Sequence, residues 1–369
     1  MKTVLLLHRH LLPRGGGACV GAWAVEALRQ RARLTVISWE PIDYSGVNRN
    51  FGTCLEPGQF ETHHVPPLLR SVVDRLPAAA VQLRLALMLR RARQLDCERR
   101  FDVLLCTDDQ VDFGRPGIQY VHYPWPWLLE HRERPSVYRW LCQRIAPASS
   151  AGVRRNATVA NSKFVAQILA DRYGIASAVV YPPVPADLAV TPWAERENAV
   201  IAISRFHPFK RLLEIIEIIA RVRQRQPLQL TLIGTPDDQT YERAVRQAAK
   251  RHGEWVRLRT NLSREELDQA IATHRYGIHA AVEEHFGIAI AQMLRGGCIP
   301  FVHATGGPTE IIGDMPGLRF GSDDQAVERI VAVAGDAARQ LEIREQLAQR
   351  LDLFSTERFM EELRSCVLG

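Results

Sequence analysis

The 369-residue sequence has no CxxC pair among its seven cysteines, and no uncharged apolar run approaches the length of about 20 residues that a membrane-spanning helix needs. Scattered cysteines in odd number indicate reduced thiols, and the missing CxxC argues against a structural zinc site. The apolar amino-terminal stretch is broken at once by His8-Arg9-His10. We therefore interpret it as a first strand rather than a signal peptide, and expect a cytoplasmic protein.

Lysine is also scarce, because the net charge of +6 is carried almost wholly by arginine. The lysines are Lys2, Lys163, Lys210 and Lys250. Nucleotide bias in the coding DNA accounts for much of the arginine, but the excess still favours anionic partners such as phosphates, sugar nucleotides or an acidic membrane surface. Nucleic acid is not an expected partner, because no recognition motif or basic-aromatic sheet pattern is present.

Short β-rich runs alternate with amphipathic segments along nearly the whole chain, a pattern typical of parallel sheets covered by helices on both faces. The expected strands lie at 2–8, 33–39, 101–107, 118–124, 157–162, 199–206, 228–234, 256–261, 276–282 and 298–304. The proline-rich segment 181–198 divides them into two series. We predict an α/β protein with two Rossmann-like doubly wound domains facing a cleft. The first comprises residues 1–185 with a returning carboxyl-terminal helix 353–369, and the second comprises 195–352.

In such sheets ligands bind beyond the carboxyl ends of the strands, so the loops that follow the strands are candidate sites. The first is Arg14-Gly15-Gly16-Gly17-Ala18, before a helix expected near Val20. Glycines allow close backbone approach and a helix amino terminus attracts anions. The loop fails the G-x-G-x-x-G fingerprint, which disfavours a dinucleotide oxidoreductase, and by itself it suits a plain turn equally well.

Three further loops could hold a phosphate. Ser204–Arg211 brackets a turn with Arg205 and Lys210, either as a diphosphate site or as solvated surface charge. The loop 283–287 precedes an apolar helix that carries a lone Gln292, and Thr305–Glu310 opens another helix. Four such loops facing one cleft are a stronger indication than any one of them.

The segment EEHFGIAIAQMLRGGCIPFVHATGGPTEII (283–312) resembles the retaining, GT-B-fold glycosyltransferases of family 4. It is especially similar to the branch of α-1,2-mannosyltransferases that extends the lipid-linked oligosaccharide core. Supporting segments are the glycine loop, YVHYP (120–124), residues 161–184 and SRFHPFKR (204–211). The resemblance covers essentially the whole chain and its motif order agrees.

The family signature is E-x7-E, and the resemblance assigns Glu284 to the donor sugar's hydroxyls. The second position is Gln292, which keeps an acceptor oxygen for the nucleotide's ribose but loses the charge. Arg205 and Lys210 would neutralise the diphosphate leaving group, and His122 would orient the sugar or stabilise the transition state. The remaining donor-binding positions that the resemblance implies are Gly16, Gly17, Gly234, His285, Phe286, Gly287 and Ile288.

The resemblance implies retention of anomeric configuration without an enzymic base, since the departing phosphate takes the acceptor's proton. No metal and no cofactor are expected, with the sugar nucleotide as substrate and a GDP-sugar favoured over a UDP-sugar. The adjacent acids Asp108-Asp109, Asp237-Asp238 and Asp323-Asp324 are interpreted as turns rather than metal ligands.

The acceptor, a glycan or a lipid-linked or small molecule, should dock on the first domain. The leucine- and arginine-rich stretch 66–100 could lie on an anionic membrane as an amphipathic helix, or could be an ordinary domain helix. The aromatic residues Tyr120, Tyr123, Trp125 and Trp127 could stack on a sugar or lipid, or could pack in the core. The alternatives for the whole protein are a glycosyl phosphorylase or nucleotide-sugar hydrolase on the same fold, and a non-catalytic sugar-nucleotide-binding subunit.

Overall fold

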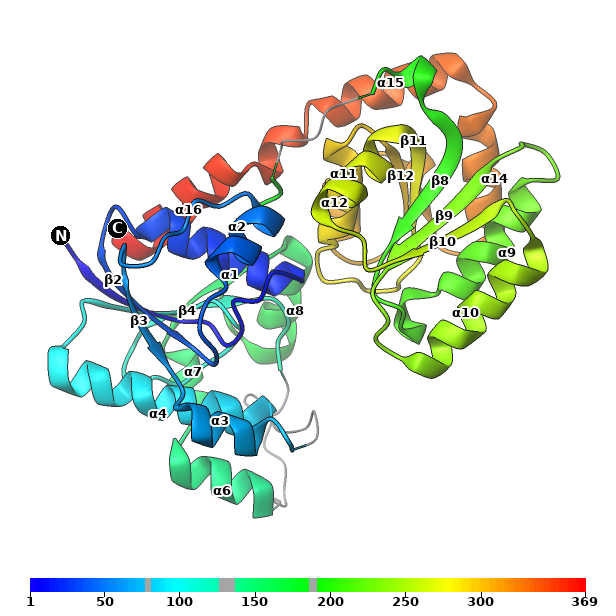
Figure 1. Ribbon diagram of the computed structural model, residues 1–369. Helices are drawn as coiled ribbons and strands as arrows, with labels where there is room; N and C mark the ends of the chain where they lie inside the picture. The colour runs from blue at the N-terminus through cyan, green and yellow to red at the C-terminus, as the bar shows by residue number, and fades with distance from the viewer. Residues whose placement is uncertain (77–80, 126–136, 186–190) are drawn as a thin grey trace. The chain divides into compact units, whose positions relative to one another are not determined.

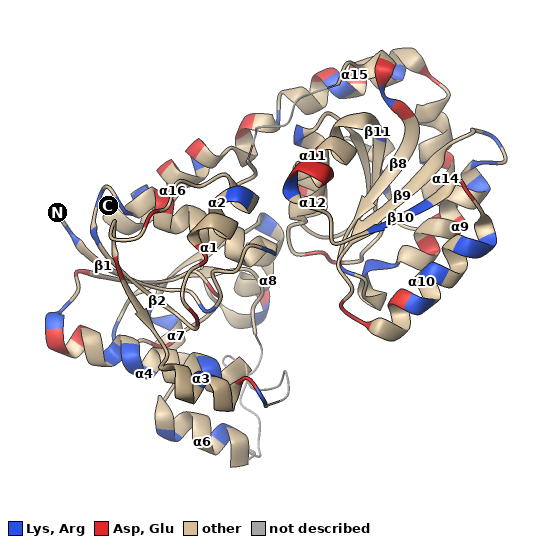
Figure 2. Cartoon of the chain, viewed as in Figure 1, with Lys and Arg blue, Asp and Glu red and all other residues tan. Residues whose placement is uncertain are grey.

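The computed structural model describes residues 1–76, 81–125, 137–185 and 191–369. The chain divides into two compact units, the first formed by Met1–Pro183 with Thr356–Gly369 and the second by Val184–Ser355 (Figure 1). The sequence had placed these divisions at residues 185 and 353. Each unit is an α/β layer structure, and Figure 2 shows most charged residues on the helices and loops and few on the strands.

The first unit contains a seven-stranded sheet in the order β3-β2-β1-β4-β5-β6-β7, with all neighbouring strands parallel. Its strands are β1 (Thr3–Leu7), β2 (Arg33–Ser38), β3 (Glu61–His64), β4 (Val103–Cys106), β5 (Ile118–Val121), β6 (Ala157–Ala160) and β7 (Ala178–Val179). Its helices are α1 (Gly16–Leu28), α2 (Tyr44–Phe51), α3 (Pro67–Val73), α4 (Val81–Arg99), α6 (Val137–Ile145), α7 (Ser150–Arg154), α8 (Lys163–Tyr173) and α16 (Thr356–Leu368).

The alternation of β1 shows why both faces of this sheet are covered. Val4 and Leu6 belong to one core cluster, formed with α1 and α16, while Leu5 and Leu7 belong to a second cluster, formed with α4. Because successive side chains of a strand point to opposite faces, a fully apolar strand needs a helix layer on each side. The returning helix α16 is tied to α1 by Arg364 Nε, which donates to the Ala27 carbonyl at 2.7 Å.

The second unit contains a six-stranded parallel sheet in the order β10-β9-β8-β11-β12-β13. Its strands are β8 (Glu197–Ile203), β9 (Gln229–Gly234), β10 (Val256–Thr260), β11 (His274–His279), β12 (Ile299–His303) and β13 (Arg319–Phe320). Its α-helices are α9 (Leu212–Val222), α10 (Gln239–His252), α11 (Arg264–Thr273), α12 (Ile288–Arg295), α13 (Pro308–Ile312), α14 (Asp323–Ala334) and α15 (Ala337–Ala348). Short 3₁₀ turns are η2 (Trp193–Glu195), η3 (Pro208–Lys210), η4 (Pro316–Leu318) and η5 (Leu351–Phe354).

The prediction of two doubly wound domains is confirmed, and each of the ten expected strands is present with slightly different ends. Three short strands, β3, β7 and β13, were missed. The predicted amphipathic stretch 66–100 contains two separate helices, and the leucines of α4 lie in the core, so α4 is an ordinary domain helix. None of the described helices is both long and apolar enough to cross a membrane.

Candidate functional site

In the second sheet the strand order reverses at β8, whose neighbours are β9 and β11. Chain connections leave β8 and β11 in opposite directions at such a switch point, and this opens a crevice beyond their carboxyl ends. The loop after β8 carries Lys210 in η3, and the loop after β11 carries Glu284. Both predicted residues therefore lie at the position where a doubly wound sheet binds its ligand.

The structure brings Glu284 together with two basic side chains. Its Oε2 atom forms an ion pair with Lys210 Nζ and accepts a hydrogen bond from His279 Nε2 at 3.0 Å. Burial alone would raise the pKa of the Glu284 carboxyl, but the hydrogen bond and charge of His279 and the charge of Lys210 outweigh it and hold this pKa far below 4.5. Both partners engage Oε2, so within the described residues the Oε1 atom is left to accept a hydrogen bond from a ligand.

Two glycines set the backbone position of Glu284. A β-carbon at Gly306 would lie 2.4 Å from the Glu284 carbonyl oxygen, and one at Gly307 would lie 2.3 Å from the His285 carbonyl oxygen. The Gly307 amide donates to the Glu284 carbonyl at 2.8 Å. The loops after β11 and β12 can thus approach this closely because Gly306 and Gly307 have no side chain at the contact. The loop Thr305–Glu310 supports the Glu284 loop, and its contact with phosphate stays a prediction.

Gln292 lies in the middle of α12, four residues after Ile288, and both residues are partly exposed on the same face of the helix. Among the described residues the side-chain amide of Gln292 has no hydrogen-bond partner, which suits a side chain that contacts a ligand. Glu284 does not lie on this helical face, because α12 begins only at Ile288, after Gly287 at φ 92°. Glu284 reaches the site through its loop.

The other predicted residues of this loop differ in what they can do. Phe286 is buried and its ring lies 5.8 Å from that of Phe354, so its side chain is part of the core. Gly287 caps α12, and a β-carbon there would lie 2.4 Å from Ile290. That the backbone N–H groups of His285, Phe286 and Gly287 contact the donor sugar nucleotide stays a prediction.

Arg205 is exposed and forms an ion pair with Asp237 at 2.7 Å, which links the loops after β8 and β9. Gly234 ends β9, where a β-carbon would lie 1.8 Å from the Ser204 carbonyl oxygen, so the glycine is required by packing between the same two loops. Asp238 accepts hydrogen bonds from the Thr240 and Tyr241 amides as the cap of α10. That Arg205 and Gly234 bind the donor sugar nucleotide stays a prediction.

The first sheet repeats the arrangement, since its order reverses at β1, between β2 and β4. A cavity of about 400 Å³ lies at this switch point. Its lining residues are His8, Arg9, His10, Leu12, Arg14, Gly17, Ala18 and Asp108. Arg9 Nε lies 3.0 Å from Asp108 Oδ2, so one carboxylate offsets part of the positive charge.

Helix α1 begins earlier than the sequence indicated, at Gly16 rather than near Val20. Gly15 has φ 85° and ψ 150°, a conformation that is essentially restricted to glycine. Gly16 and Gly17 are thus the first helical residues, whose N–H groups have no partner within the helix. Gly17 lies close to His122, because a β-carbon on it would be 3.9 Å from His122 Nε2.

His122 directly follows β5, and its ring is fixed by Nε2, which lies 3.1 Å from the Thr107 carbonyl. A carbonyl only accepts, so Nε2 is the donor and a neutral ring keeps Nδ1 as an acceptor. Asp109 accepts from the amides of His122 and Tyr123 and from the Trp125 indole, at 2.7–2.9 Å. Of the predicted aromatic cluster, Tyr120 is in the core and Trp127 lies outside the described residues.

Asp108 and Asp109 lie in a bend after β4, where the sequence indicated a turn, but both carboxylates also make specific contacts. Asp108 is partly buried and pairs with Arg9, and Asp109 is buried and organises the His122 loop. Asp323 and Asp324 lie in the first turn of α14. They form ion pairs with Arg211 and Arg221 at the two ends of α9. No group of three or more His, Cys, Asp or Glu side chains is arranged to hold a metal ion within the part of the chain that the structure describes.

Sequence reasoning missed His279, Asp109 and Arg9. His279 ends its strand five residues before Glu284, and Arg9 lies two residues after β1, so the rule that ligands meet strand ends could have raised both. Asp109 gave no such indication, because its three acceptor contacts depend on the tertiary path of the loop after β5.

Comparison with known proteins gives a family match that lies within the second unit. Residues 184–350 match the family described as Glycosyl transferases group 1. The chain is 25% identical over 210 residues to the human GDP-Man:Man(3)GlcNAc(2)-PP-Dol alpha-1,2-mannosyltransferase, covering 51% of this chain and 43% of that protein. The protein of the same name from Candida glabrata is 30% identical over 146 residues, 35% of this chain and 29% of the relative. The chain thus spans less than half the length of these curated relatives.

Solved structures match over almost the whole chain. HepE of Anabaena in complex with UDP-glucose covers 99% of both chains with a TM-score of 0.69 and 15% identity. WaaG, a glycosyltransferase involved in lipopolysaccharide biosynthesis, covers 99% of this chain and 100% of its own with a TM-score of 0.70 and 15% identity. At such identities the likeness establishes the fold.

The chain therefore has the GT-B fold of two Rossmann-like domains. Its second unit matches the Glycosyl transferases group 1 family, and Glu284, Lys210 and Gln292 lie inside the matched residues.

Proposed function

We propose that the protein is a retaining, metal-independent glycosyltransferase that moves a hexose, mannose favoured, from a sugar nucleotide to a glycan or lipid-linked acceptor. The observation that carries the proposal is the charged Glu284 carboxylate at the switch point of a Glycosyl transferases group 1 domain. Its free Oε1 suits a donor sugar's hydroxyl groups. The names of the curated relatives support GDP-mannose as donor and a lipid-linked oligosaccharide as acceptor.

In the proposed reaction the bond between the anomeric carbon and the diphosphate breaks, and negative charge grows on the leaving phosphate. Lys210 and Arg205 supply positive charge in the loop after β8, and fixed charges that meet developing charge lower the barrier. Gly16 and Gly17 present first-turn N–H groups in the first unit, next to His122. That these residues and those around Glu284 face one bound donor is part of the proposal.

The test is transfer from GDP-mannose to a soluble mannose-terminated acceptor, with the product's anomeric configuration read by NMR. We expect an α-linked product at an unchanged rate in excess chelator, and no transfer by Glu284→Ala. Loss of activity in chelator would contradict metal independence. Donor binding without transfer to any acceptor would favour a non-catalytic binding subunit, and a requirement for free phosphate would favour a phosphorylase.

We also propose that the protein acts at the cytoplasmic face of a membrane, in peripheral contact with anionic lipid. The support is the chemistry of a lipid-linked acceptor, named for the curated relatives, and the arginine-rich charge of +6.

A further inference from the structure

Large apolar side chains are exposed on two helices of the first unit, α3 and α6. The α3–α6 surface, as we define it, consists of Leu68 (84% exposed), Val72 (60%), Leu76 (44%), Val137 (83%), Trp140 (58%) and Leu141 (43%). These six are half of the twelve large apolar side chains that are exposed in the described part of the chain. Single exposed apolar residues are normal, but such a concentration marks an interaction surface.

Both helices use their opposite faces for packing. Val73 of α3 and Cys142 of α6 are buried in the same core cluster as Leu83 and Leu89 of α4. On α6 the exposed residues recur at positions 137, 140 and 141, the spacing of one helical face. Folding of the unit therefore satisfies one side of each helix and leaves the other side without a protein partner among the described residues.

The first turn of α4 places the two exposed faces at the same end of the unit. Arg84 forms an ion pair with Asp74, directly after α3, at 3.1 Å, and the neighbouring Leu83 amide donates to the Tyr138 hydroxyl of α6 at 3.0 Å. Adjacent residues of α4 thus hold both helices, which lie near each other in Figure 1. The exposed residues form one local surface rather than two distant ones.

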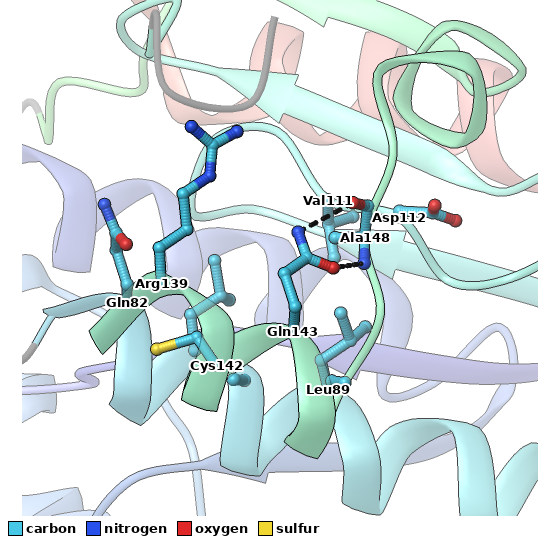
Figure 3. A pocket seen from close by; sticks show the side chains of 11 residues that line it. Gln82, Leu89, Val111, Asp112, Arg139, Cys142, Gln143 and Ala148 are labelled. Atoms are coloured by element: carbon cyan, nitrogen blue, oxygen red, sulfur yellow. Dashed lines mark hydrogen bonds between the residues drawn. The ribbon is translucent and has the colours of Figure 1, made fainter. Parts of the chain in front are cut away.

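The cavity behind α6 is too small to be the receptor for an apolar chain. Its volume is about 30 Å³, room for one or two water molecules. Gln143 closes one side by exchanging two hydrogen bonds of 2.9 Å with the Ala148 backbone (Figure 3). An apolar partner therefore has to meet the outer surface of α3 and α6.

The charge around this surface selects an anionic partner. Arg70, Arg75, Arg139 and Arg144 lie on or next to the two helices, α6 carries no acidic residue (Figure 2), and the neighbouring acid Asp74 is paired with Arg84. Exposed leucine, valine and tryptophan flanked by arginine are what the interface of an anionic bilayer accommodates, with apolar groups in the acyl boundary and guanidinium groups at the phosphates.

We propose that the α3–α6 surface docks the protein on an anionic lipid bilayer by inserting these apolar side chains. The inference gives the proposed membrane contact a defined surface, and its biological meaning rests on the proposed function, because a lipid-linked acceptor is presented at a bilayer. The surface includes α3 from the stretch 66–100 that the sequence suggested and adds α6, whereas α4 of that stretch supplies the support.

The experiment is co-sedimentation of the full chain with phosphatidylcholine vesicles, with and without roughly 30% phosphatidylglycerol, at low salt without donor or acceptor. We expect binding to the anionic vesicles and a loss of at least about tenfold in Leu68→Ser/Val137→Ser. Arg75→Gln/Arg144→Gln should weaken binding several-fold on anionic vesicles only. The matched control is Leu341→Ser, an exposed leucine of α15 in the second unit, which should bind like the wild type.

Three outcomes would overturn the proposal. The wild type could stay in the supernatant with both vesicle types, or Leu68→Ser/Val137→Ser could bind as well as the wild type. Ultracentrifugation could instead show a wild-type dimer that this variant converts to monomers, which would make a second copy the occupant. Transfer to a soluble acceptor needs no vesicle, so failure of the docking proposal and failure of the proposed function are separable.

Discussion

At the scale of single residues, the site depends on how one partly buried carboxylate keeps its charge. Glu284 is stabilised by Lys210 and His279, both of which contact the same oxygen. A charge taken out of water without such partners would be neutralised by proton uptake. The ion pair therefore maintains a negatively charged acceptor at the switch point before any ligand arrives.

Replacing Glu284 with glutamine should lower kcat/KM for transfer roughly 10- to 100-fold, the value of a hydrogen bond to a charged group. The neighbouring Glu283 is exposed, and Glu283→Gln is the matched control that should change neither activity nor Tm. Steady-state kinetics check both. Equal kinetics of the Glu284→Gln variant and the wild type would contradict a role for this carboxylate.

The same residue predicts a pH dependence of stability. Its folded-state pKa lies below the usual 4.5, so its stabilising contribution is fully present above pH 4.5 and is lost only as the pH falls further through the folded-state pKa. The Tm difference between the wild type and Glu284→Gln should be constant near neutral pH and shrink below about pH 4. A difference that already shrinks between about pH 7 and 6 would be inconsistent with a depressed pKa.

Gln292→Ala should weaken donor binding about 2- to 10-fold, because one neutral hydrogen bond to the ribose is lost, whereas Gln292→Glu should be tolerated. Calorimetric titration measures both affinities. Gln346→Ala, on the exposed face of α15, is the matched control. Equal donor affinity in all of these proteins would show that Gln292 does not meet the nucleotide.

The residue-scale site was only partly accessible from sequence. Lys210 was noticeable because lysine is rare in this chain, and Glu284 because a family motif placed it. Their mutual contact could not be inferred, since it joins loops 74 residues apart. The position of His279 at a strand end could have raised it, but nothing local shows that this histidine holds a carboxylate rather than packs in the core.

At the scale of elements, the packing of the loops after β11 and β12 determines where Glu284 lies. Gly306 has φ 90°, and any β-carbon there would collide with the Glu284 backbone. Gly306→Ala should therefore destabilise the fold by roughly 1–3 kcal/mol and also reduce donor affinity. The control is Gly253→Ala, which has a similar φ of 84° but open space around the position, so it should lower Tm without changing affinity. Chemical unfolding and calorimetry separate the two effects, and equal loss of affinity in both variants would contradict the account.

His8, directly after strand β1, is a second pH-sensitive residue. Burial lowers the pKa of His8 to about 4, and a β-carbon at Gly21 would lie 2.8 Å from its ring. Because the unfolded chain binds a proton near pH 6.5 and the folded chain does not, stability should fall by roughly 2–4 kcal/mol between pH 6.5 and 4 and then level off. His8→Asn should reduce this slope in pH-dependent unfolding. An unchanged slope would show that His8 is already protonated in the folded state.

Element identity followed from sequence more readily than element ends. The apolar strands were found because both faces of each are buried. Strand β3, ETHH, was missed because it has no apolar pattern. Helix α1 was expected to begin after its glycines, yet its first turn includes two of them, since first-turn N–H groups need no intrahelical acceptor. The stretch 66–100 was expected to be one helix, and the exposed face of α6 was missed, because amphipathic spacing does not say which apolar residues find a partner.

At the scale of the whole molecule, the two units repeat one design: a parallel sheet whose order reverses at β1 in the first and at β8 in the second. In both, charged side chains collect at the reversal, with Arg9 and Asp108 in one and Lys210 and Glu284 in the other. Topology thus decides where ligands can bind, and the side chains decide which ligand. The GT-B fold therefore does not define the nucleotide base and sugar of the donor or the acceptor, and these have to be determined by experiment.

The central claim is that the second unit binds a sugar nucleotide between Glu284 and Gln292, and calorimetric titration with GDP, UDP and ADP tests it most directly. The account predicts saturable binding of GDP at one site, weaker binding of UDP, and weakened GDP binding by Gln292→Ala. Tighter binding of UDP would keep the fold and the reaction class but remove mannose as the favoured sugar. Binding of none of the three nucleotides would contradict the claim and the enzyme proposal with it.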